Sequence, residues 1–143
     1  MEETDDASAS PADTTTDTES REPASRIGRL LFAGGLFALA VRNLTDLDGR
    51  IAYADAKGVP KADALVPAAS GLLLGGSLGI GAWKLPKLSA GSVAAFFAGV
   101  TPVMHDFWAV DDDSRDEELT SFLQNLTLFG AAVAFFARAG DDE

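Results

Sequence analysis

Residues Ala64 to Trp83 read ALVPAASGLLLGGSLGIGAW, a run of twenty residues without one charged side chain. A helix needs about 20 predominantly apolar residues to cross the ~30 Å hydrocarbon core of a bilayer. This run is apolar around its whole circumference, which is typical of a helix surrounded by lipid or buried on every side. It therefore predicts a membrane-spanning helix.

Three further blocks of the chain have the same character. They extend from Arg26 to Leu44, from Leu88 to Val110 and from Leu119 to Ala137. A soluble domain of 143 residues could not bury four such helices, because its outer faces need polar side chains. The sequence therefore predicts an all-α fold, a four-helix transmembrane bundle, in preference to a soluble helical bundle.

Polar segments separate and flank these blocks. Residues 45–63 have the pattern of a short interfacial helix between spans 1 and 2, ended by Gly58 and Pro60. Ser114 and Glu117 form an S-x-x-E capping box that predicts the start of the fourth span. We expect the transmembrane domain to cover residues 26–139, between a disordered acidic N-terminal tail at 1–25 and an acidic C-terminal tail at 140–143.

The charge balance excludes several classes of protein. The chain carries 22 acidic and 11 basic residues, a net charge of −11, and no cysteine. Such a polyanion has no basic stripe to meet nucleic acid, and without cysteine there is neither a disulfide nor a thiolate metal site. Because excess carboxylates keep a surface hydrated in strong salt, the composition favours a halophilic host, and we expect a halophilic archaeon.

The basic residues give a weak orientation signal. With four spans both termini lie on one side, where six Lys and Arg residues gather against five on the other. The positive-inside rule then places both termini in the cytoplasm, with the chain in the cell membrane.

Small residues recur at the spacing of one helix face in three of the spans. Such faces allow close approach of helix backbones in lipid, so we predict that they pack against neighbouring helices. The residues are Gly71, Gly75 and Gly79 in the second span, Gly91, Ala95 and Gly99 in the third, and Gly28, Gly35 and Ala38 in the first.

Polar residues within the spans are the natural candidates for a functional site, because each is costly in hydrocarbon. Five of them fall in the half of the bilayer opposite the termini, and they are our candidates for a ligand or proton site: Arg42, Asn43, His105, Asp106 and Asn125. By their spacing along the helix, Arg42 and Asp106 lie on the same faces of their spans as the small residues. We therefore predict that these two form an ion pair.

Three interpretations of this cluster stay open. In the first, the charged groups reach toward the headgroups, with Trp108 in the interfacial aromatic belt. In the second, the cluster is a structural latch that fixes the helices. In the third, it binds a proton or a polar ring such as a quinone, with His105 as the titrating group. A single histidine without cysteine gives no basis for a metal site, and no catalytic triad is supported.

The order of motifs resembles the DoxX family of small membrane proteins over residues 26–139. The motifs are GRLLFAGGLFALAVRNL, a surface segment ending in KGVP, the glycine-rich second span, HDFW and FLQNLTLFGA. The resemblance implies a four-helix bundle with both termini inside. It points to Arg29, Asn43, Gly58, Pro60, His105 and Asn125. The chain departs from the family pattern at Ser70-Gly71, because many relatives have a glutamate early in the second span.

The resemblance implies an accessory subunit linked to quinone-level redox chemistry or to the handling of oxidative stress. The family takes its name from a subunit of a thiosulfate–quinone oxidoreductase, so a quinone is the cofactor it suggests. The expected partners are the lipid bilayer and either a membrane redox subunit or a second copy of the chain. No catalytic motif is present, and the alternative is a non-enzymatic protein that organises the membrane or scaffolds a complex.

Overall fold

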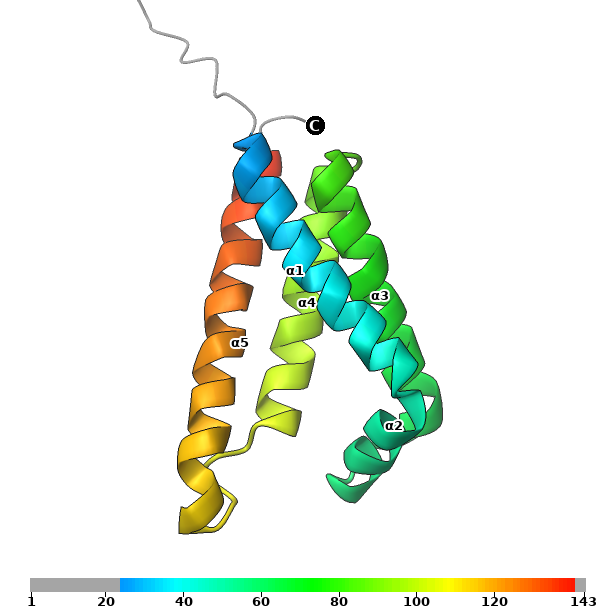
Figure 1. The fold of residues 1–143 in the computed structure, drawn as a ribbon, viewed down its shortest axis with the longest axis vertical. Helices are drawn as coiled ribbons and strands as arrows, with labels where there is room; N and C mark the ends of the chain where they lie inside the picture. Colours follow the sequence, from blue (N-terminus) through cyan, green and yellow to red (C-terminus); the bar gives the residue numbers. More distant parts are fainter. Residues whose placement is uncertain (1–23, 141–143) are drawn as a thin grey trace, which may run out of the picture.

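The computed structural model describes residues 24–140, and this part of the chain is all-helical (Figure 1). The helices are α1 (Arg26–Thr45), α2 (Leu47–Ala56), α3 (Ala62–Ala82), α4 (Pro86–Met104) and α5 (Asp112–Ala139). The predicted acidic tails at 1–25 and 140–143 lie outside the described residues, apart from residues 24, 25 and 140.

Four of these helices are long and apolar enough to span a membrane. They are α1, α3, α4 and α5, with 20, 21, 19 and 28 residues. Large hydrophobic side chains are exposed on all four, and only 6% of the apolar window of α5 is buried. Exposed apolar faces of this extent are unfavourable in water and favourable in lipid, so the predicted multi-pass bundle is confirmed.

The short helix predicted between the first two spans is also present, as α2. It ends where Gly58 adopts a φ of +82°. The N–H of Gly58 donates to the carbonyl of Asp55 at 2.9 Å, and that of Val59 donates to Ala54 at 3.0 Å. A left-handed glycine of this kind closes a helix because it has no Cβ to clash.

Two predicted boundaries are wrong. The third span was expected to continue to Val110, but α4 ends at Met104, since the N–H of His105 bonds Thr101 and the chain then leaves the helix. The fourth span begins with Asp111 as N-cap rather than with the Ser114 capping box. Carboxylates in the first turn of α5 suit its N-terminal dipole, and this allows the helix to start earlier.

The helices pack as a sequence of neighbours: α1 against α3, α3 against α4, and α4 against α5, with α2 against α3. The buried core comes chiefly from α1, α3 and α4, and its largest fully buried side chains are Leu36, Leu73, Ile80, Val93 and Phe97. Figure 1 shows the described ends of α1 and α5 together at one end of the bundle, opposite α2.

An aromatic cluster closes the bundle at the end near the termini. The ring of Phe32 on α1 stacks on Phe135 of α5, with 5.0 Å between centroids. Trp83, in the turn after α3, meets Phe135 edge-on at 6.3 Å and receives the guanidinium of Arg29 over its ring at 5.0 Å. These contacts join α1 to α5, which otherwise have few contacts.

The glycine faces pack differently from the prediction. Added Cβ atoms on Gly71, Gly75 or Gly99 would meet no heavy atom within 4 Å, so these three glycines do not pack against a helix. Gly79 does pack, against Ser89 of α4. A Cβ added to Gly91 would lie 3.3 Å from the ring of Phe136 on α5. On α1, Gly35 is open and Ala38 is exposed.

A second close approach between α3 and α4, and the one that meets the α4 backbone, involves a glycine outside the predicted set. A Cβ added to Gly76 would lie 2.8 Å from Cγ2 of Val93 and 2.9 Å from the backbone carbonyl oxygen of Ser89. Those distances are too short for carbon. The buried face of α3 therefore follows Leu73, Gly76 and Ile80, which is rotated from the predicted Gly71–Gly75 face.

Gly76→Ala should destabilise the bundle, because the new methyl group must displace the α4 backbone. We expect a fall of about 1–3 kcal/mol in the free energy of unfolding in detergent, the usual cost of overpacking. Gly75→Ala is the matched control, and there we expect no loss, since alanine favours a helix over glycine. Equal destabilisation by the two substitutions would contradict this packing.

Candidate functional site

A cavity of about 580 Å³ lies among the helices on the α2 side of the core. Its walls are formed mostly by apolar side chains of α3 and α4, among them Leu65, Leu72, Phe96 and Val103. Pockets of a few hundred Å³ with apolar walls and a few polar groups are the usual form of small-molecule sites. This cavity is therefore the candidate site.

Polar residues line the cavity from five different elements. Asn43 comes from α1, Arg50 and Tyr53 from α2, Ser70 from α3, His105 from the connection after α4, and Asn125 from α5. Asn43 lies near the end of α1 and His105 directly follows α4, so both lie at the end of the bundle where α2 is found. Most of the remaining wall is apolar.

Arg50 is the unusual member of this group. Its Nε is buried and has no hydrogen-bond partner, and no carboxylate within residues 24–140 forms an ion pair with its guanidinium. A buried donor left unpaired costs free energy, and the cost is larger for a charged group. A ligand that brings an acceptor oxygen into the cavity would remove this cost.

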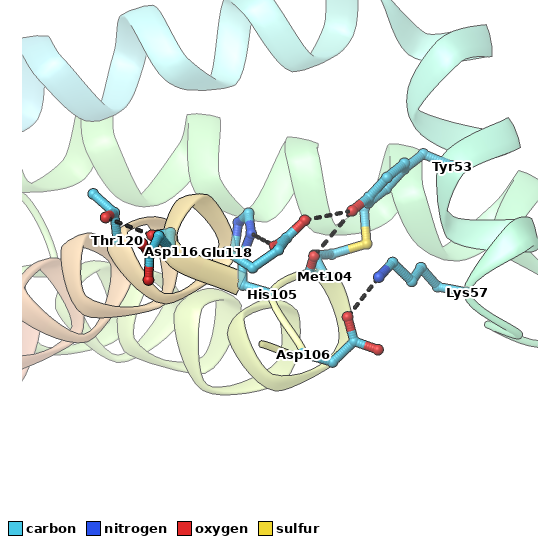
Figure 2. A network of polar contacts seen from close by, with 8 residues as sticks. All are labelled: Tyr53, Lys57, Met104, His105, Asp106, Asp116, Glu118 and Thr120. Carbon is cyan, nitrogen blue, oxygen red and sulfur yellow. Dashed lines mark hydrogen bonds and ion pairs between the residues drawn. The ribbon is translucent and has the colours of Figure 1, made fainter. Parts of the chain in front are cut away.

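Side-chain bonds join α2 to the connection between α4 and α5, and we call this set the polar clasp (Figure 2). Lys57 Nζ lies 2.5 Å from Asp106 Oδ1. The Tyr53 hydroxyl lies 3.2 Å from the Met104 carbonyl oxygen and 3.4 Å from Glu118 Oε1. The clasp matters because α2 packs on α3 and α1 rather than on α4 or α5.

His105 completes the clasp. Its Nδ1 lies 2.9 Å from Glu118 Oε2. An ionised carboxylate only accepts hydrogen bonds, so Nδ1 carries the proton and donates. The other ring nitrogen, Nε2, is then left for a further partner. Because His105 also lines the cavity, the clasp and the site share this residue.

The clasp groups have shifted pKa values. The hydrogen bond from Lys57 lowers the pKa of Asp106 below its ordinary 3.8, and the same bond raises the pKa of Lys57 above 10.5. Burial, and then the charge of Glu118, raises the pKa of Tyr53 above 10.0. Tyr53 therefore stays protonated and donates, while Lys57 and Asp106 stay charged.

Aromatic rings hold the α4–α5 connection in place. The rings of Phe107, Trp108 and Phe122 meet edge-to-face, with centroids 5.1 to 6.0 Å apart. Phe122 belongs to α5, so this cluster fixes the two residues that precede it, His105 and Asp106, relative to that helix. Trp108 is 54% exposed.

The structure brings together three of the five predicted site residues. Asn43, His105 and Asn125 all line the cavity. The predicted pairing of Arg42 with Asp106 is wrong, because Asp106 bonds Lys57 of α2, and Arg42 is exposed at the end of α1. The prediction extended α4 past its real end, and the chain turns after Met104 toward α2.

Sequence reasoning did not identify Arg50, Tyr53, Lys57 or Glu118 as site residues. The sequence did carry part of the signal, because Tyr53 is the one tyrosine of the chain and lies on a short helix between spans. Glu118 was hidden in an acidic run, where only its position next to an apolar block distinguishes it.

The other residues suggested by the resemblance lie outside the cavity. Arg29 is at the opposite end of the bundle, over Trp83. Gly58 ends α2, and Pro60 lies in the turn that leads to α3. Within residues 24–140 no three His, Cys, Asp or Glu side chains are grouped so that they could hold a metal ion.

No family model, curated protein or solved structure matches the chain. Function is therefore inferred from the cavity and from the side chains around it.

Asp106→Asn should loosen α2 from the α4–α5 connection, since it removes the charge that holds Lys57. We expect a broader and longer distance distribution between spin labels on Asp55 of α2 and Asp112 of α5, measured in detergent. Asp113→Asn changes an exposed carboxylate in the first turn of α5. It is the control and should leave the distance distribution unchanged. An unchanged distribution in Asp106→Asn would contradict the clasp.

The Lys57–Asp106 bridge should also withstand wide changes of pH. The lowered pKa of Asp106 means that its contribution is lost only as pH falls below about 3.8, and the raised pKa of Lys57 means that its contribution is lost only above about 10.5. In a Glu118→Gln variant, which leaves this bridge alone, the label distance should stay constant between these limits. Separation at neutral pH would refute this assignment.

Proposed function

We propose that the cavity binds the ring of a membrane quinone, and that the protein serves as an accessory subunit in quinone-level redox chemistry. Arg50, which lines this largely apolar cavity and has a buried Nε without a hydrogen-bond partner, carries this proposal. It agrees with what the resemblance to the DoxX family implies.

A quinone ring suits the chemistry of the cavity. Its two carbonyl oxygens accept hydrogen bonds, and its ring is flat and apolar. The polar end offers the guanidinium of Arg50 and the amides of Asn43 and Asn125, for which no protein partner is found within the described residues. The opposite wall offers Phe96 and aliphatic side chains. Directed donors in an apolar site fix orientation and give specificity.

A quinone would reach the cavity from the lipid. The lining residues Leu65, Leu72 and Val103 are 51%, 42% and 39% exposed, and they lie on the lipid-facing sides of α3 and α4. Tyr53 and His105 of the clasp line the α2 end. The open side thus faces hydrocarbon, where a quinone is dissolved.

Electrons would come from a partner. The chain has no cysteine, and the described residues include no group of three His, Cys, Asp or Glu side chains placed to hold a metal ion. In this proposal a membrane redox subunit supplies the electron carrier. In this proposal the protein holds the quinone for that subunit in the cell membrane, with both termini in the cytoplasm.

Arg50→Gln should weaken quinone binding. The substitution removes a charged donor whose hydrogen bond to a carbonyl would be worth about 1.5–3 kcal/mol, which is roughly 10- to 100-fold in affinity. The measurement is titration of the purified protein in mild detergent with a short-chain benzoquinone.

Arg42→Gln is the matched control, because it removes an exposed guanidinium that does not line the cavity. We expect it to bind like the unmodified protein. If the unmodified protein binds no quinone and instead copurifies with a stoichiometric protein partner, the scaffolding alternative replaces this proposal.

A further inference from the structure

A second hollow continues from the cavity along the lipid-facing side of α4. It has a volume of about 510 Å³ and shares Leu72 and Ala95 with the first cavity. Its other walls include Leu88 and Gly91 of α4 and Phe136 of α5, and Lys87 lies at its far end. We call this second hollow, together with the strip of α4 that leads to it from Gly99, the α4 groove.

The groove exists because its floor is made of small residues. Gly99, Ala95 and Gly91 follow one another at four-residue spacing on α4. Ala95 and Gly99 are exposed, and an added Cβ on Gly99 would meet nothing within 4 Å. All three were expected to pack against a helix, but only Gly91 does so, against Phe136, and Ala95 and Gly99 leave open space. The stretch of α4 from Gly99 to Lys87 is about 18 Å long at 1.5 Å per helical residue.

Protein walls two sides of the cavity. Leu73 and Phe97 are fully buried in the core, and the clasp residues Tyr53 and His105 line the α2 end. On the lipid-facing side of α3 and α4, where Leu65, Leu72 and Val103 are exposed, a molecule whose head lies at Arg50 can extend outward. Leu72 and Ala95 lead from there into the groove.

We propose that the α4 groove binds the hydrocarbon chain of the molecule whose ring occupies the cavity, so that the ligand is a long-chain quinone. This inference rests on the proposed function for its ring. The occupant is a hydrocarbon chain because the groove is lined mostly by apolar residues and is continuous with the cavity. Chain binding here gains packing contacts, since a chain in lipid is already out of water.

Two probes test the chain site: a short-chain benzoquinone, and the same ring with a long isoprenoid chain. The unmodified protein should bind the long-chain probe about ten-fold more tightly. Ala95→Leu places a bulky side chain where the two hollows meet, and should abolish the preference for the long-chain probe over the short-chain probe. Gly75→Leu is the control, because Gly75 is open but lines neither hollow.

The outcomes separate the two proposals. Equal affinity of the unmodified protein for both probes would overturn the chain site and leave the ring site standing. If neither quinone binds, the ring proposal fails, and a long-chain alcohol with a terminal photoreactive diazirine then tests the groove alone. Labelling of Gly91 or Phe136 that Ala95→Leu abolishes supports the chain site, and absence of such labelling overturns it.

A second copy of the chain is the competing occupant of the groove. Because the chain has no cysteine, Ala95→Cys would introduce its one thiol. Disulfide-linked dimers formed by this variant in native membranes would show that another copy covers the groove, and would overturn the proposal. A monomeric variant that remains open to a maleimide, and is protected by the long-chain probe, supports it.

Discussion

The cavity depends on the polar clasp. α2 contributes Arg50 and Tyr53 to the cavity wall, yet it packs only on α3 and α1. The bond between Lys57 and Asp106 and the bonds of Glu118 with Tyr53 and His105 hold it opposite α5. Without those bonds that wall would be free to move away, and the donors of α2 would move with it.

Hydrophobicity predicted the number of spans and the short helix between them, because length and the absence of charge decide whether a segment can cross a bilayer. It did not predict which face of each helix packs. In water, polar residues mark the outer face of a helix, whereas in lipid both faces are apolar. Gly75 and Gly76 are neighbours of the same type, yet one faces lipid and the other contacts α4.

The sequence predicted those residues of the site that lie within the membrane spans. Asn43, His105 and Asn125 were identified by their cost in hydrocarbon, and all three line the cavity. Arg50, Tyr53 and Glu118 could not be found this way, because they belong to segments where polar residues are ordinary. Their roles follow from the fold of α2 back toward the end of α4, and that placement depends on long-range contacts.

The latch and the ligand site proposed for the polar cluster involve different atoms. Lys57 and Asp106 pair with each other, and Glu118 pairs with Tyr53 and His105, so these charged groups have little to offer a ligand and act as the latch. Arg50 has a buried donor left over, and it lies on the same short helix as Lys57. His105 belongs to both sets, since Nδ1 is committed to Glu118 and Nε2 is not. The paired groups thus position the unpaired ones, and a site for an acceptor oxygen follows from that division.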